Sequence, residues 1–192
     1  DQELPSDEKN KIALFCSVPN DSVISMHDVE TVYSVPLLLH SQKVDKTILK
    51  KLKINTKQAK LNDWKRVVKA KLLPEKEVTV SFVGKYTELK DSYKSINEAL
   101  EHAGIKNKTR VNINFVEAES LTSKNIHKTL KNSDAILVPG GFGERGIEGM
   151  ILACKYAREN NIPYLGICLG MQVAIIEYAR NVLNLKGANS TE

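Results

Sequence analysis

The stretch Ile162–Gln172, with the sequence IPYLGICLGMQ, decides the fold of the second half of the chain. The apolar run before Cys168 follows Pro163, is too short for a helix, and has the character of a buried parallel strand. From Leu169 onward the apolar residues recur at helical spacing. The sequence therefore predicts a strand, a sharp turn that carries the cysteine, and a helix.

Cys168 is predicted to be a nucleophile at this turn. Gly166 and Gly170 leave room for a tight turn and for close packing of the strand on the helix. The positive end of the helix favours the thiolate, which is the reactive form. The N–H of Leu169 would lie where an oxyanion forms when a carbonyl carbon is attacked. The alternative is a buried core cysteine, since cysteine is among the most buried residue types.

Composition and charge indicate a globular protein. The chain is 42% hydrophobic, opens on a polar stretch without a signal segment, and has no run as long as a membrane span. Three cysteines without C-x-x-C spacing fit a reducing compartment, so we predict a cytoplasmic protein with Cys16 and Cys154 in its core. The net charge of +5 permits a nucleic-acid or nucleotide partner but does not require one. The lysines between Lys43 and Lys76 accompany only one aromatic residue, Trp64, which favours a solvated helix surface.

Strands and helices alternate from Glu77 onward. Besides the strand before Cys168 and the helix after it, we predict strands at 78–83, 110–116 and 135–138 and helices at 91–103, closed by Gly104, at 124–130 and at 147–159. Such alternation predicts an α/β fold: a parallel open sheet with helices on both faces. Its sites lie at the carboxyl ends of the strands. The glycine-rich loop at 139–146, PGGFGERG, follows one of these strands and is not a P-loop; Gly141 would supply a second oxyanion donor.

The first part of the chain has a different pattern of apolar and polar residues. Apolar runs at 11–18 and 23–26 predict strands, Asp28 predicts a helix N-cap ahead of Pro36, and 44–52 predicts an amphipathic helix. Two strands cannot build a sheet core alone, which indicates the tail of a larger domain. The predicted organisation is a first domain at 1–54, a linker at 55–77 with one helix capped by Asn62 and ended by Pro74, and a second domain at 78–192.

Two groups of motifs together carry a resemblance to a known protein family. The loop at 139–143 and the stretch 166–172 resemble the triad-type glutamine amidotransferases. The upstream motifs narrow the resemblance to CTP synthases: KIALFC at 11–16, DVETVY at 28–33, VGKY at 83–86 and GANSTE at 187–192. The resemblance covers essentially the whole chain. It implies the first half of a flavodoxin-like glutaminase domain, preceded by the end of an α/β synthetase domain.

The resemblance implies an activity, cofactors and partners. A CTP synthase uses ATP and Mg²⁺ to phosphorylate UTP at the 4-oxygen, and ammonia released from glutamine then displaces the phosphate to give CTP. GTP as an activator, CTP as an inhibitor and a homotetramer are implied as well, with no nucleic-acid or membrane partner and no cofactor for the glutaminase step. The family's phosphate loop and magnesium ligands belong to an earlier region, and its triad His and Glu come after Glu192. We therefore assign the base to none of the four histidines, and expect neither half-reaction to be efficient in this chain alone.

The resemblance also implies roles for individual residues of this chain, at the positions that match the motifs of the family. Cys168 is then the nucleophile that forms a glutamyl thioester, with Gly141 and Leu169 as oxyanion donors. The implied glutamine-binding residues are Gly141, Leu169, Gly170, Met171, Gln172 and Glu192. The carboxylate of Glu192 suits the ammonium group of glutamine. In the first domain Lys11 matches a pyrimidine-nucleotide contact, and Asp28 and Val29 match the ATP site. No metal ligand is implied in this chain.

Two other functions remain open. An α/β hydrolase of the deglycase or intracellular-protease type also carries a cysteine at a strand-to-helix turn, although Met171, Gln172 and the loop around Phe142 argue against it. A non-catalytic fragment that binds glutamine or nucleotide is the other. If the turn activates its cysteine, Cys168 will be modified faster than Cys16 or Cys154.

Overall fold

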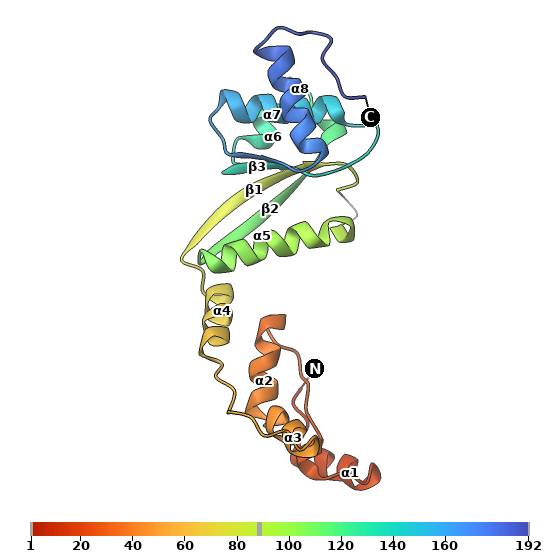
Figure 1. Ribbon diagram of the computed structural model, residues 1–192, viewed down its shortest axis with the longest axis vertical. Helices are drawn as coiled ribbons and strands as arrows, with labels where there is room; N and C mark the ends of the chain where they lie inside the picture. The colour runs from red at the N-terminus through yellow and green to blue at the C-terminus, as the bar shows by residue number, and fades with distance from the viewer. Residues whose placement is uncertain (1, 88–89, 192) are drawn as a thin grey trace. The chain divides into compact units, whose positions relative to one another are not determined.

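A computed structural model describes residues 2–87 and 90–191 of the chain (Figure 1). The chain forms two compact units, Asp1–Pro74 and Glu75–Glu192. Most of the predicted linker at 55–77 thus falls in the first unit. There Trp64 donates its Nε1–H to the backbone carbonyl of Tyr33 over 2.7 Å, which ties this segment to its own unit.

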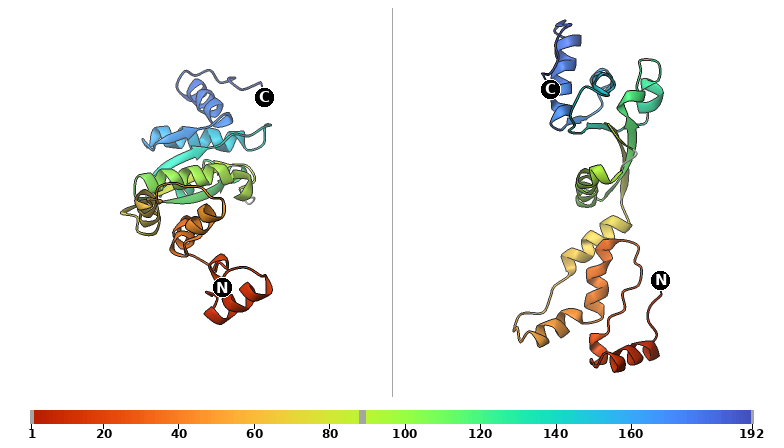
Figure 2. Two further views of the ribbon diagram at one scale, coloured as in Figure 1. Left: turned by 60° about the horizontal axis from the view of Figure 1, so that its bottom comes forward. Right: turned by 90° about the vertical axis from the view of Figure 1, so that its right-hand side faces the viewer.

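The second unit is built on a parallel sheet with helices on both faces, as predicted. Its strands are β1 (Lys76–Gly84), β2 (Thr109–Glu117), β3 (Ala135–Val138) and β4 (Tyr164–Gly166), in the order β2-β1-β3-β4. Helix α5 (Lys94–Lys106) lies on one face, and α6 (Ile126–Leu130), α7 (Ile147–Glu159) and α8 (Leu169–Asn181) lie on the other (Figures 1 and 2). Two 3-10 turns, η3 (Lys90–Tyr93) and η4 (Ala118–Ser120), precede α5 and α6.

The central strands are buried on both faces. Phe82 of β1 and Leu137 of β3 pack in the cluster that α5 covers. Their chain neighbours Val83 and Val138 point the opposite way, into the larger cluster built with α7 and α8. Because both faces are covered, β3 is a continuous apolar run in the sequence, and β1 is buried from Val80 to its end, with Ser81 as the polar residue in that part. Strand β2 lies at the edge of the sheet, and its burial alternates along the strand.

Three helix boundaries in this unit differ from the prediction: both ends of α5, each three positions later than predicted, and the start of α6. Helix α5 runs from Lys94 to Lys106, so Gly104 lies inside the helix and does not end it. A Cβ on Gly104 would lie 2.5 Å from the carbonyl oxygen of Thr109. Gly104 is therefore needed because α5 packs closely against β2 at this point. In the sequence alone, a glycine at this position resembles the end of a helix. Helix α6 begins at Ile126, two positions later than predicted.

All regular elements described in the first unit are helical. They are α1 (Ser6–Phe15), α2 (Val35–Ser41), α3 (Val44–Lys51) and α4 (Asn62–Leu72), with 3-10 turns η1 (Asn20–Ser22) and η2 (Val32–Ser34). The predictions for α3 and α4 are confirmed, although Leu61 and not Asn62 occupies the N-cap position of α4. The strands predicted at 11–18 and 23–26 are wrong.

The physical reason for this error is the lack of a partner strand. No strand is described between residues 2 and 74, and an unpaired strand would leave its backbone groups without protein partners. A helix satisfies these groups internally, and Asp7 and Glu8 in the first turn of α1 complement its positive end. Cys16 follows the end of α1 and is exposed, so the prediction that it belongs to the core is wrong.

The segment 23–29 is extended and irregular. Its Ser25 is 1% exposed and is held by Gln42: the N–H of Ser25 donates to Oε1 over 2.9 Å, and Nε2 donates to the Ser25 carbonyl over 2.9 Å. Asp28 caps no helix, contrary to the prediction. The cap is Thr31, whose Oγ1 accepts from the N–H of Tyr33 over 3.4 Å at the start of η2.

Candidate active site

Cys168 lies at a sharp turn between β4 and α8, as predicted. Strand β4 ends at Gly166, α8 begins at Leu169, and Cys168 occupies the N-cap position of the helix. Its backbone has φ 52° and ψ −106°. A non-glycine residue with this positive φ is strained by about 1–3 kcal/mol and persists only where the surroundings enforce it. The exposed thiol thus sits on an enforced turn at the carboxyl end of the sheet.

The two glycines beside Cys168 make this turn possible. A Cβ on Gly170 would lie 2.1 Å from the carbonyl oxygen of Val138, at the end of β3. A Cβ on Gly166 would lie 2.4 Å from both the carbonyl carbon and oxygen of Gly170. Real Cβ atoms do not approach backbone atoms this closely, so helix, turn and strand pack together only without side chains at these two positions.

The glycine-rich loop lies directly beside the turn. A Cβ on Gly140 would be 3.4 Å from Cβ and 4.0 Å from Sγ of Cys168, and one on Gly141 would be 3.3 Å from Cδ2 of Leu169. The N–H of Ile167 donates to the carbonyl of Val138 over 2.9 Å, which joins the two loops at their bases. Because β3 and β4 are parallel neighbours, their carboxyl ends meet at one edge of the sheet.

The N–H groups predicted as oxyanion donors come from these two loops. Leu169 is the first residue of α8, so the helix itself does not use its N–H. Gly141 contributes the second N–H from the half-buried part of the glycine-rich loop, in van der Waals reach of the Leu169 side chain. The arrangement can present two backbone donors near the thiol. Their role as an oxyanion hole stays a prediction.

The predicted glutamine-binding residues follow along the first turn of α8. Gly170 is buried, Met171 is 55% exposed, and Gln172 is half-buried. The amide Oε1 of Gln172 accepts a hydrogen bond from Ser190 over 2.9 Å, which brings the segment 187–191 against this helix. Glu192, the remaining predicted residue, lies outside the described residues.

The environment of Cys154 is unlike that of the other two cysteines. It is buried in α7, as predicted, whereas Cys16 and Cys168 are exposed. Burial raises the pKa of the Cys154 thiol to about 11, and the negative charge of Glu177 adds to the shift. Glu177 is itself 1% exposed and accepts three hydrogen bonds from Arg158, at 2.8, 3.0 and 3.2 Å. Cys154 is therefore a core thiol, protonated at neutral pH.

The raised pKa of Cys154 predicts a loss of stability at alkaline pH. The unfolded chain releases this proton near the ordinary value of 9.0, while the folded chain holds it until about pH 11. The free energy of unfolding should therefore fall by roughly 2–3 kcal/mol as the pH rises through this window. Urea unfolding at several pH values should show a shallower fall for Cys154→Ala, and Cys16→Ala should keep the wild-type slope. Equal slopes in all three proteins would contradict the prediction.

The residues predicted to bind nucleotide lie in the first unit. Lys11 is exposed on α1 and pairs with Glu8 at 3.2 Å, while Asp28 is exposed and Val29 is half-buried in the segment 23–29. In the described ranges 2–87 and 90–191, no group of three or more His, Cys, Asp or Glu side chains could hold a metal ion. Asp28 alone offers fewer ligands than Mg²⁺ takes, so we derive no step through ATP or magnesium. Nor is any helix described in these ranges long and apolar enough to cross a membrane.

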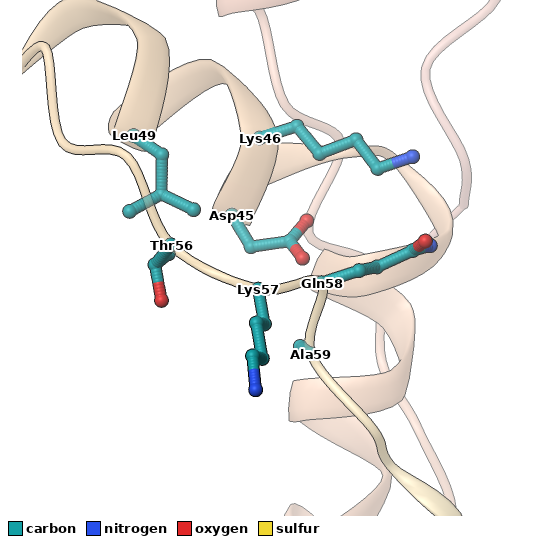
Figure 3. Close-up of a pocket in the computed structure, with 7 residues that line it drawn as sticks. All are labelled: Asp45, Lys46, Leu49, Thr56, Lys57, Gln58 and Ala59. Carbon is teal, nitrogen blue, oxygen red and sulfur yellow. The ribbon is translucent and has the colours of Figure 1, made fainter.

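A cavity of about 310 Å³ lies in the first unit between α3 and the segment 56–59 (Figure 3). It is lined by Asp45, Lys46, Leu49, Thr56, Lys57, Gln58 and Ala59. Desolvation raises the pKa of Asp45, but hydrogen bonds from the Lys46 backbone and from His40, at 2.9 Å, outweigh it and lower the value. None of the residues predicted to bind nucleotide lines this cavity, so it does not support their assignment.

Sequence reasoning did not single out Lys85 as a site residue. This lysine directly follows β1 and is only 5% exposed. Its Nζ donates to the backbone carbonyls of Phe142 over 2.8 Å and Gly143 over 2.6 Å, both in the glycine-rich loop. Burial lowers the pKa of Lys85, and the charge of Arg145 lowers it further. The sequence did contain a signal for Lys85: a charged residue that closely follows a predicted buried strand.

Comparisons with known proteins agree with this geometry. Residues 88–191 match the family model described as glutamine amidotransferase class-I, and residues 1–54 match that of the CTP synthase N-terminus. Among solved structures, the chain is similar to the Trypanosoma brucei CTPS glutaminase domain with bound acivicin, at 45% identity and a TM-score of 0.57. The match covers 60% of this chain and 45% of that one, so this chain spans less than half of the related structure's length.

Proposed function

The chain belongs to the class-I glutamine amidotransferase family, and from this premise we propose that its second unit releases ammonia from glutamine at Cys168. The observation that carries the proposal is the strained turn at the N-terminus of α8. It holds an exposed cysteine beside Gly140 of the glycine-rich loop. An elbow of this kind is suited to attack on a carbonyl carbon.

The proposed reaction has two steps at the thiol. The Cys168 thiolate attacks the carboxamide carbon of glutamine, and the resulting oxyanion is stabilised by the N–H groups of Gly141 and Leu169. The C–N bond then breaks, ammonia leaves with a proton from a general acid, and a glutamyl thioester remains. Water attacks the thioester, which gives glutamate and restores the thiol. Gly170, Met171, Gln172 and Glu192 are proposed to hold the glutamine.

For the whole protein we propose CTP synthesis. The support is the order of the two family matches, with the CTP synthase N-terminus ahead of the amidotransferase, and the 45% identity to a CTPS glutaminase domain. UTP and ATP as substrates, Mg²⁺ as cofactor, GTP as activator, a homotetramer and a cytoplasmic location belong to this proposal. So do the nucleotide contacts of Lys11, Asp28 and Val29.

The test uses the protein as encoded by its complete gene. We expect it to release ammonia from glutamine, and diazo-oxo-norleucine, a glutamine analogue with an electrophilic carbon, to add one adduct that peptide mapping places on Cys168. We also expect CTP to form from UTP and ATP with either glutamine or ammonium as the nitrogen source. If ammonium supports CTP formation but glutamine does not, and Cys168 stays unlabelled, the glutaminase proposal is wrong.

The same assay addresses the other two functions. An α/β hydrolase of the deglycase or protease type would act on glycated or peptide substrates and would leave glutamine intact. A fragment that only binds would show saturable glutamine binding without ammonia release. Either result would contradict the proposal that Cys168 hydrolyses the amide of glutamine.

A further inference from the structure

The tip of the glycine-rich loop needs an anchor that the residues at the tip do not supply with their own side chains. Phe142 at its tip is 87% exposed, so it contributes little packing. Gly143 has φ +75°, and no heavy atom beyond its own residue and its two chain neighbours lies within 4 Å of the position where its Cβ would be. A loop with so few contacts should sample many backbone conformations. Its Gly140 and Gly141, however, must stay in register with Cys168 for an oxyanion donor to be of use.

Lys85 supplies an anchor at the tip of this loop. Its ammonium group donates to the two successive carbonyls of Phe142 and Gly143, at 2.8 and 2.6 Å. Fixing two successive carbonyls restricts rotation of the peptide units between them and of the units just upstream. The backbone of Lys85 is itself held, because its carbonyl accepts from the hydroxyl of Tyr93 over 2.6 Å. The lysine therefore links the rigid end of β1 to the loop.

A second anchor holds the far end of the loop. Arg145 donates through Nε to the carboxylate of Glu119 and lies over the ring of Tyr86, 5.2 Å from its centroid. Glu119 and Arg145 are more exposed than Lys85, as is Tyr86 at 54%. The stretch of loop nearest Cys168 thus depends on the buried lysine.

A purely structural role explains the burial of Lys85 poorly. Removing an ammonium group from water is costly, and pairing it with neutral carbonyls recovers less than pairing it with a carboxylate. An apolar side chain of similar length would fill the space without that cost. What it could not do is donate to two loop carbonyls at once.

We propose that Lys85 is a positioning residue for the reaction at Cys168, which fixes the glycine-rich loop so that the N–H of Gly141 stays beside the thiol. This inference rests on the proposed function, because it assigns Lys85 a part in the attack on glutamine. Lys85 does not touch the reacting atoms. It acts through the backbone of Phe142 and Gly143.

The test compares Lys85→Met with Lys76→Met in the protein encoded by the complete gene. Methionine keeps the length of the side chain and removes its donors. Lys76 is an exposed lysine at the opposite end of the same strand. Two alkylating reagents are used: diazo-oxo-norleucine, which must bind as glutamine does, and iodoacetamide, which needs only an accessible thiol. Hydrogen exchange of the amides at 140–146 reports on the loop directly.

For Lys85→Met we expect alkylation of Cys168 by diazo-oxo-norleucine to slow by about tenfold or more, because the oxyanion donor is no longer held in place. Alkylation by iodoacetamide should stay within about twofold, and exchange at 140–146 should rise by about tenfold. Lys76→Met should match the wild type in all three measurements. For Lys85→Gln, which keeps one donor group, the alkylation and exchange rates should lie between those of Lys85→Met and the wild type. If Lys85→Met does not fold, Lys85→Gln is used in its place.

Several results would overturn the proposal. One is a Lys85→Met protein that reacts with diazo-oxo-norleucine at the wild-type rate. Another is equal slowing with both reagents, because this indicates general damage to the turn. Failure of the wild-type protein to react with diazo-oxo-norleucine would count against the proposed function, and the exchange comparison would still decide whether Lys85 holds the loop. Unchanged exchange at 140–146 would overturn that role by itself.

Discussion

Replacing Cys168 with alanine is expected to lower glutamine-dependent ammonia release by at least about 10³-fold and to abolish the adduct with diazo-oxo-norleucine. The reason is that alanine has no group that can form a thioester, while the turn that carries it is otherwise kept. Formation of CTP from added ammonium should continue at the wild-type rate, since it bypasses glutamine. The measurement is a coupled assay of glutamate release and of the proposed CTP formation, on one preparation of the protein encoded by the complete gene.

The matched control for this variant is Cys16→Ala. Cys16 is the other exposed cysteine, but it follows the end of α1 in the first unit and is far from any strand-to-helix turn in the sequence. We expect Cys16→Ala to keep both activities. Iodoacetamide should modify Cys168 faster than Cys16, because only Cys168 lies at the positive end of a helix, and should modify the buried Cys154 slowest. Equal loss of glutaminase activity in the two variants would contradict the assignment of the nucleophile.

Gly170→Ala should destabilise the second unit by about 3 kcal/mol and disable Cys168 as well. The added Cβ would lie 2.1 Å from the carbonyl oxygen of Val138 and 2.9 Å from its carbonyl carbon. These are backbone atoms of the end of β3, which cannot turn away as a side chain can. The helix must move outward instead, and the turn that it enforces on Cys168 relaxes. Urea unfolding measures the first effect, and alkylation by diazo-oxo-norleucine measures the second.

Gly187→Ala provides the comparison. No heavy atom beyond Gly187 and its two chain neighbours lies within 4 Å of the position that its Cβ would take, and its φ is not in the left-handed region. The free energy of unfolding should therefore stay within about 0.5 kcal/mol of the wild type. If Gly170→Ala proved as stable and as reactive as Gly187→Ala, the close packing of α8 on β3 would not be what enforces the turn.

The second unit could be predicted well because its signals are local. A strand covered on both faces is rich in apolar residues, as β3 is, and a helix shows a period that no strand has, so the alternation of the two predicts a parallel sheet. The turn at Cys168 has a local signal too: glycines at 166 and 170, where a Cβ would meet backbone atoms. The carboxyl ends of β3 and β4 then place the glycine-rich loop beside the cysteine by topology alone.

The first unit shows where local signals mislead. The run at 11–18 has the composition of a buried strand, yet a strand forms only where another strand pairs with it. Whether a partner exists is a property of the tertiary structure, and in the described part of this unit α1 forms instead. The exposure of Cys16 follows from that outcome. Likewise, Gly104 serves the packing of α5 on β2, which its neighbours in the sequence do not reveal.

By itself, the sequence determined the parallel sheet of the second unit, the turn at Cys168 and the family resemblance, because each depends on residues close together in the chain. Only the tertiary structure decided that the first unit is helical, that Cys16 is exposed, and that Lys85 reaches the carbonyls of Phe142 and Gly143. Those features depend on contacts between segments far apart in the chain, which no local pattern of residues encodes.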